Sequence, residues 1–148
     1  MRVGKLVPHA RLPKKVSPGD PGVTLFSAET YNLEYSEVHA FRTGLVVEIP
    51  EGSFGMLMNR VTTNGVVVGG VVLTSQDTGE VRVPIQNNHR SALEIKSGMP
   101  LCQFVIFTDD SDEDVEEFEG TSLSAELKDK ADKARAAFNK EAKATVKK

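Results

Sequence analysis

The 148-residue sequence contains no tryptophan, a single cysteine and no apolar run long enough to cross a bilayer. One cysteine cannot form a disulfide within its own chain, so the fold must depend on packing and hydrogen bonds. The lack of a long apolar run, and of an apolar stretch after Met1, argues against a membrane span and a secretory signal. We therefore expect synthesis in the reducing cytoplasm, with Cys102 as a buried structural thiol.

Several chemical signatures are also missing. The sequence has neither a glycine-rich phosphate loop nor the G-x-S-x-G pattern of a nucleophile elbow. Its three histidines, His9, His39 and His89, are scattered and have no cysteine at metal-ligand spacing, so we expect surface or turn histidines. No metal site and no cofactor are predicted from these residue types.

Charge divides the chain into three segments. Residues 1–108 are nearly neutral, residues 109–119 carry eight acidic side chains and no basic one, and residues 123–148 carry eight basic and four acidic ones. A near-neutral body lacks the basic footprint of a nucleic-acid binder. We predict a folded body over 1–108, a solvated acidic linker over 109–122, and a basic helical tail over 123–148.

The body has the pattern of an all-β protein. Short apolar runs are separated by Gly, Pro, Asn and Asp, with the clearest turns at residues 50–52 and 76–79. The apolar runs lie at residues 44–49, 54–58, 66–73, 81–85 and 101–107. Such spacing favours a sandwich or barrel of antiparallel strands over alternating strands and helices. The glycine pair inside 66–73 indicates a bulge or the close approach of another backbone.

Residues 65–81, with the sequence GVVVGGVVLTSQDTGEV, resemble the uracil-binding hairpin of the trimeric dUTPases without a gap. The resemblance spans residues 6–107, because other segments match that family's motifs in the same order. These further segments are residues 6–13, 21–28, 43–55 and 96–103. The resemblance implies a dUTPase-like antiparallel β-barrel or jelly roll that forms a homotrimer. In that family, three subunits share active sites at their interfaces and exchange C-terminal arms.

Three positions of this hairpin differ from the family pattern at residues with a role in the site or its support. The aspartate that orients the attacking water falls on Thr74, and the tyrosine that stacks on the deoxyribose falls on Asp77. A hydroxyl cannot replace a carboxylate as general base. Thr78 stands where the family has arginine, which removes the charge partner of Glu80 within the motif.

The other nucleotide-binding positions are also altered. Thr24 replaces the aspartate that helps to hold the metal and triphosphate, and a neutral hydroxyl is a poor Mg²⁺ ligand. Arg60 of the phosphate motif is kept, whereas Val61 replaces its serine. Gln103 is kept in the fourth motif, where a role in the scaffold is favoured over phosphate binding. The resemblance therefore makes these residues, with Thr74 and Asp77, vestigial positions of a nucleotide site.

From these losses the sequence predicts a chain that is not an enzyme. Our leading hypothesis is a catalytically inactive trimer with a structural or assembly role, such as a decoration or cement protein of a viral, plausibly phage, capsid. Its partner would then be a capsid or another assembly, and its location would include the virion. One alternative is a regulatory protein-binding module of dUTPase descent. The other is a divergent dUTP pyrophosphatase in which Asp77, Glu80 or the acidic tail holds Mg²⁺.

Overall fold

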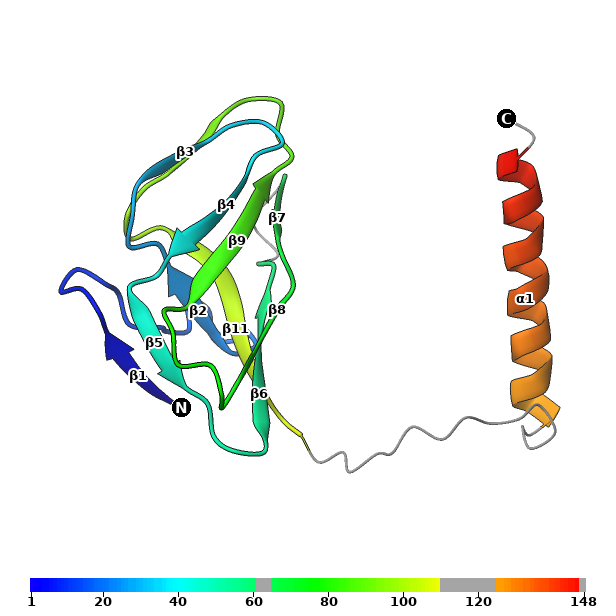
Figure 1. Ribbon diagram of the computed structural model, residues 1–148, viewed down its shortest axis with the longest axis horizontal. Coiled ribbons are helices and arrows are strands. Elements are labelled where there is room, and N and C mark those ends of the chain that lie inside the picture. Colours follow the sequence, from blue (N-terminus) through cyan, green and yellow to red (C-terminus); the bar gives the residue numbers. More distant parts are fainter. Residues whose placement is uncertain (61–64, 110–124, 147–148) are drawn as a thin grey trace. The chain divides into compact units, whose positions relative to one another are not determined.

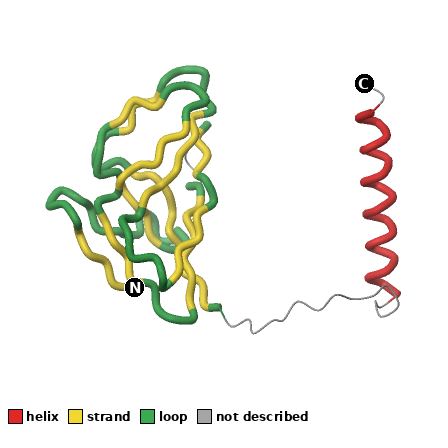
Figure 2. Tube along the Cα trace, viewed as in Figure 1, coloured by secondary structure: helices red, strands yellow, loops and turns green. Residues whose placement is uncertain are grey.

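The computed structural model describes residues 1–60, 65–109 and 125–146. The chain divides into two compact units, Met1–Asp110 and Ser111–Lys148. The first unit consists of short strands joined by turns, and the second contains one helix, as Figures 1 and 2 show. This architecture confirms the all-β prediction for the body and the prediction of a helix after residue 123.

The strands of the first unit are short and pair in an antiparallel manner. They are β1 (Arg2–Lys5), β2 (Val23–Phe26), β3 (Tyr31–Leu33), β4 (Val38–Arg42), β5 (Leu45–Glu48), β6 (Ser53–Met58), β7 (Val66–Val68), β8 (Val71–Thr74), β9 (Arg82–Asn87), β10 (Leu93–Ile95) and β11 (Pro100–Thr108). Hydrogen bonds group them into the sheets β1–β5, β10–β3, β2–β11–β6–β8 and β4–β9–β7. In the described residues the strands therefore form four sheets and not one closed barrel.

The apolar run at residues 66–73 is divided between two sheets. β7 pairs with β9, whereas β8 pairs with β6, and the change of partner occurs at Gly69 and Gly70. The amide of Gly69 donates to the carbonyl of Pro84 at 2.8 Å. A Cβ on Gly69 would lie 3.0 Å from Cγ of Pro84, so glycine permits this close approach. The glycine pair therefore marks the crossing between the sheets.

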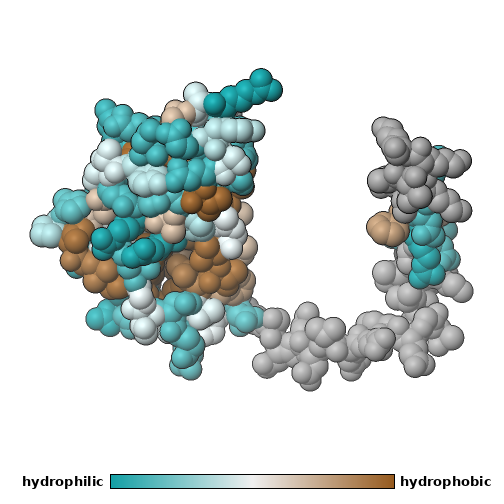
Figure 3. Space-filling model, turned by 45° about the horizontal axis from the view of Figure 1, so that its top comes forward, coloured by the Kyte–Doolittle hydropathy of each residue, from teal (hydrophilic) through white to brown (hydrophobic). Residues whose placement is uncertain are grey.

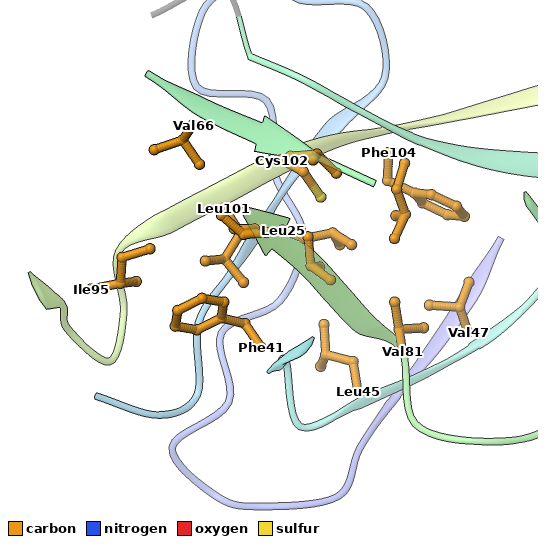
Figure 4. Packing of buried hydrophobic residues seen from close by; sticks show 14 of the residues in the cluster. Leu25, Phe41, Leu45, Val47, Val66, Val81, Ile95, Leu101, Cys102 and Phe104 are labelled. Carbon is orange, nitrogen blue, oxygen red and sulfur yellow. The ribbon is translucent and has the colours of Figure 1, made fainter. Parts of the chain in front are cut away.

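The core lies between the sheets, and Figure 4 shows its packing. Phe104 is 1% exposed, and its ring packs on Gly55, where a Cβ would lie 2.3 Å from Cε2 of Phe104. Cys102 is fully buried, and burial raises the pKa of its thiol to about 12. The buried thiol predicted from the sequence is thus confirmed. The buried apolar residues are Ala10, Leu25, Leu33, Phe41, Leu45, Val47, Ile49, Leu57, Val66, Val68, Val81, Val83, Ile85, Ile95, Leu101, Cys102 and Phe104.

A buried carboxylate ties the segment after β8 to the neighbouring strands. Glu80 accepts hydrogen bonds from Nε of Arg42 at 3.2 and 3.3 Å and from the amide of Gly44 at 3.0 Å, and Nε of Arg82 lies 3.5 Å away. The two arginines are directly opposite each other on β4 and β9. Like charges in that position repel, and the Glu80 side chain, 10% exposed, offsets the repulsion. The charge partners of Glu80 therefore come from other strands, not from position 78.

The helix α1 spans Ala125–Val146. Asp129 and Lys133 form an i,i+4 ion pair at 2.7 Å, and the ring of Phe138 is 71% exposed. In the part of the chain that the structure describes, no helix is long and apolar enough to cross a membrane. The predicted acidic linker and the start of the tail at residues 123–124 lie outside the described residues.

The burial of Phe104 predicts a large loss of stability on truncation. Phe104→Ala should lower the free energy of unfolding by about 3–5 kcal/mol, because it removes buried ring surface and leaves a cavity. Phe138→Ala is the matched control, because the same change at an exposed ring should alter stability by about 0.5 kcal/mol or less. Urea unfolding followed by circular dichroism checks both, and equal effects would contradict the described core.

The Glu80 contacts predict a second stability difference. Glu80→Gln should destabilise the β unit by about 1–3 kcal/mol, because it leaves two opposed arginines without their shared carboxylate. The control is Glu48→Gln, which removes the exposed pair with Arg2 and should cost about 0.5 kcal/mol or less. Thermal unfolding of the two variants measures the difference. A Glu80→Gln protein as stable as the control would show that the two arginines need no shared counter-charge.

Candidate functional site

Three of the nucleotide-site positions predicted from the sequence lie at one end of the four-stranded sheet. Gln103 of β11 is opposite Thr24 of β2 on one side and opposite Met58 of β6 on the other. Arg60 follows β6 by two residues and lies near enough to Cys102 to act on the thiol's charge. Val61 lies outside the described residues. Thr24, Gln103 and Arg60 thus gather at the end of the sheet where β6 finishes.

Thr24 and Gln103 are part of the packed sheet. Their exposed fractions are 1% and 7%, and the hydroxyl of Thr24 has no hydrogen-bond partner among the described residues. A buried neutral hydroxyl does not fit the role of a Mg²⁺ ligand. The described residues also contain no group of three His, Cys, Asp or Glu side chains that could hold a metal ion. The donor set at Thr24 therefore does not fit a protein-held metal.

The other two positions lie at the opposite end of the same sheet. Thr74 ends β8 and is directly opposite Phe54 of β6, which is in turn opposite Phe107 of β11. Phe54 is four residues from Met58, a separation of about 13 Å along an extended strand. Within a single copy of the chain, Thr74 and Gln103 therefore lie at opposite ends of the four-stranded sheet.

Asp77 is held against the end of β8. Its Oδ2 accepts hydrogen bonds from the amide of Thr74 at 2.7 Å and from the hydroxyl of Thr74 at 3.1 Å. The amide of Gln76 donates to the same hydroxyl at 3.2 Å, and the amide of Asp77 donates to the carbonyl of Thr74 at 3.1 Å. The threonine that replaces the expected aspartate thus fixes a carboxylate three residues further along the chain.

Asp77 also borders a small hollow of about 80 Å³. The hollow is lined by Asp77, Glu80, Gly79 and the apolar residues Val47, Ile49, Leu73 and Val81. Glu80 faces it with its charge already offset by Arg42 and Arg82. Asp77 has no cationic side chain within ion-pair distance in the described part of the chain. The two carboxylates therefore differ in their electrostatic surroundings.

A second polar cluster, around His39, was not predicted from the sequence. The His39 ring stacks on Tyr31 with centroids 3.7 Å apart, and its Nε2 lies 2.9 Å from Oε1 of Glu29. Although burial opposes the effect, hydrogen bonds from the Arg42 amide and from His39 hold the pKa of Glu29 below its usual value. A hydrogen bond to Glu37 raises the pKa of Tyr31. These residues lie within residues 29–42, but β3 and β4 belong to different sheets. The stacking of Tyr31 on His39 therefore depends on how the two sheets pack, which no local sequence pattern shows.

The chain is similar to proteins of known name in both sequence and structure. The deoxyuridine 5'-triphosphate nucleotidohydrolase of Picosynechococcus is 29% identical over 113 residues, which cover 72% of this chain and 78% of the relative. The cowpox virus protein of the same name is 25% identical over 107 residues, covering 71% and 73%. The solved dUTPase of Staphylococcus bacteriophage 80alpha has a TM-score of 0.71 and 26% identity, covering 80% of this chain and 97% of that one.

These relatives correct one prediction. The expectation that the chain is not an enzyme is wrong, because the similar proteins are named as nucleotidohydrolases. That expectation depended on several altered positions together, among them Thr24, Val61 and Asp77, and on interpreting Thr74 as the loss of a carboxylate from the hairpin. The structure has a carboxylate there, since Asp77 is hydrogen-bonded to Thr74.

The match to the family covers more of the chain than the motifs do. The family model for dUTPase matches residues 8–130, which include the four-stranded sheet with both groups of site positions. The match continues past residue 107, where the motif resemblance ends, and reaches the first residues of α1. The chain belongs to the dUTPase family.

Proposed function

We propose that this protein hydrolyses dUTP to dUMP and pyrophosphate. Family membership over residues 8–130 supports this activity, as do relatives named deoxyuridine 5'-triphosphate nucleotidohydrolases. The observation that carries the proposal is the presence of a fixed carboxylate, Asp77, at the end of the hairpin. The positions that the sequence marked as vestigial are proposed to belong to a working site.

The two ends of the sheet would have different tasks. The end with Arg60 carries positive charge and is proposed to bind the triphosphate, while Gln103 and Thr24 form the packed floor beneath it. The end with Thr74 and Asp77 is proposed to face the nucleoside and the attacking water. Val61 lies beside Arg60 in the sequence and is assigned to the phosphate end by that position alone.

We propose that such a site is built from more than one copy of the chain. The two ends are separated by about 13 Å of strand, so the hairpin of one copy would complete the phosphate end of another. The outward side of the sheet offers an apolar surface for this association. Met58 is 42% exposed, Val72 is 54% exposed and Phe107 is 39% exposed, and Phe107 stacks on Phe54. Figure 3 shows hydrophobic areas on one face of the β unit. We propose that the chain forms a homotrimer, as the family resemblance implies.

A second candidate function is the binding of a protein partner. The helix α1 continues to Val146, beyond the family match at residue 130, and it carries the exposed ring of Phe138. The phage 80alpha relative is described as one of the phage dUTPases that control transfer of virulence genes, which is a regulatory role of that protein. A regulatory partner therefore remains the alternative proposal. The capsid role stays a prediction from the sequence, as does the division at residues 108 and 122.

Activity is tested directly with the full chain. Purified protein should release pyrophosphate from dUTP, and calorimetry should record continuous heat of turnover at micromolar protein. dTTP and dCTP at the same concentration are the controls and should give at least about tenfold less product. Thymine carries a 5-methyl group for which a uracil site has no space, and cytosine presents different hydrogen-bonding groups. Equal release from all three nucleotides, or none from dUTP, would contradict the proposed function.

The shared site predicts a link between association and activity. Val72→Glu should convert the trimer to monomer and remove turnover, because it places a charge on an apolar surface that association would bury. The control is Val38→Glu, because Val38 is a similarly exposed valine on β4 of the three-stranded sheet, and this variant should remain trimeric and active. Native mass spectrometry measures the oligomeric state of both variants, and pyrophosphate release from dUTP measures their turnover. A monomeric variant with full turnover would contradict the shared site.

A further inference from the structure

The turn from Thr74 to Asp77 has a directed hydrogen-bond arrangement. The hydroxyl of Thr74 accepts from the amide of Gln76 at 3.2 Å, so its own proton is available for Oδ2 of Asp77 at 3.1 Å. The Thr74 amide donates to the same oxygen at 2.7 Å. A hydroxyl that accepts one bond and donates another has a defined orientation. Both hydrogen bonds from Thr74 go to Oδ2 of Asp77, so Thr74 does not contact Oδ1.

The surroundings single out Asp77 among the carboxylates at this end of the sheet. Glu80 lines the same hollow, but it is bound by Arg42 and Arg82, and its side chain is 10% exposed. Both carboxylate oxygens of Glu80 therefore already face donors, from Arg42, Arg82 and the Gly44 amide. Asp77 is exposed, is bound by neutral donors, and in the described residues has no cation at ion-pair distance. Asp77 is therefore the carboxylate at this end of the sheet that is open to a water molecule, through the oxygen Oδ1 that Thr74 does not contact.

We propose that Asp77 activates the hydrolytic water in this chain and that Thr74 is the residue that positions it. The inference rests on the proposed dUTP hydrolysis. A water oxygen forms a bond to the phosphorus that carries the nucleoside, and Asp77 takes the water's proton. The bond from that phosphorus to the bridging oxygen breaks, and its electron pair leaves with pyrophosphate. Asp77 then returns the proton to solvent, so the protein is unchanged after each turnover.

Thr74 contributes by limiting where the carboxylate can be. An exposed aspartate samples several rotamers, whereas two bonds to one residue confine Asp77 to the rotamer seen here. Preorganisation of a reacting group accelerates the chemical step without changing substrate affinity. Removal of the hydroxyl should therefore lower kcat and leave KM nearly unchanged. A purely structural threonine would instead alter both constants or the stability.

The test is steady-state pyrophosphate release from dUTP by the full chain and its variants. Asp77→Asn should lower kcat by about 100-fold or more, because it removes the proton acceptor. The asparagine oxygen still accepts both Thr74 bonds, so the fold should persist. The control is Asp20→Asn, since Oδ2 of Asp20 accepts from the Ser17 amide at 3.0 Å in a similar three-residue turn. This variant should keep the wild-type rate.

The positioning role of Thr74 is tested with three further variants. Thr74→Val should lower kcat about tenfold with KM within about twofold, and Thr74→Ser should restore the rate because it restores the donor. Thr78→Val removes a neighbouring exposed hydroxyl and should have no effect. If wild-type turns over and Asp77→Asn matches it within about twofold, the inference is wrong while the proposed function stands. An unchanged kcat in Thr74→Val would overturn the positioning role, and a wild-type protein without turnover would overturn both proposals.

Discussion

The antiparallel register between β6 and β11 is the constraint on which the rest of the structure depends. It sets Gln103 opposite Met58 at one end and Phe107 opposite Phe54 at the other. β2 and β8 pair with the outer edges of these two strands, so Thr24 and Thr74 take their places from the same register. A shift of one residue would turn the side chain of Phe104 out of the core, which ties the register to the hydrophobic packing.

This register places the two groups of site positions at opposite ends of one sheet. A chain can therefore have the family fold without bringing all of these positions together in one copy. The strands that keep the fold together also keep the hairpin end away from the phosphate end. The Glu80 contacts reinforce the arrangement, because they attach the segment after the hairpin to β4 and β9 and fix where it leaves β8. The contacts that stabilise one copy thus also hold the two ends of the sheet apart, which supports the proposal that a second copy completes the site.

Much of the fold could be predicted from the sequence, because burial and turns leave local patterns. The apolar runs, the turns between them and the buried Cys102 all followed from residue type and spacing. The run at residues 66–73 was predicted as one segment, since its change of sheet depends on Gly69 meeting Pro84, a contact distant in sequence. The site was harder to predict. Thr74 was read as a loss because its bonds to Asp77 depend on the backbone conformation of the turn.

The central claim is that hairpin and phosphate end come from different copies, and subunit mixing tests it most directly. Asp77→Asn damages one end and Arg60→Ala the other, so each variant alone should release little pyrophosphate from dUTP. Equal amounts unfolded and refolded together would form mixed trimers, in which about a quarter of the shared sites combine two undamaged ends. The account predicts that activity returns to about a quarter of the wild-type rate. Mixed protein that stays as inactive as its two components would contradict it.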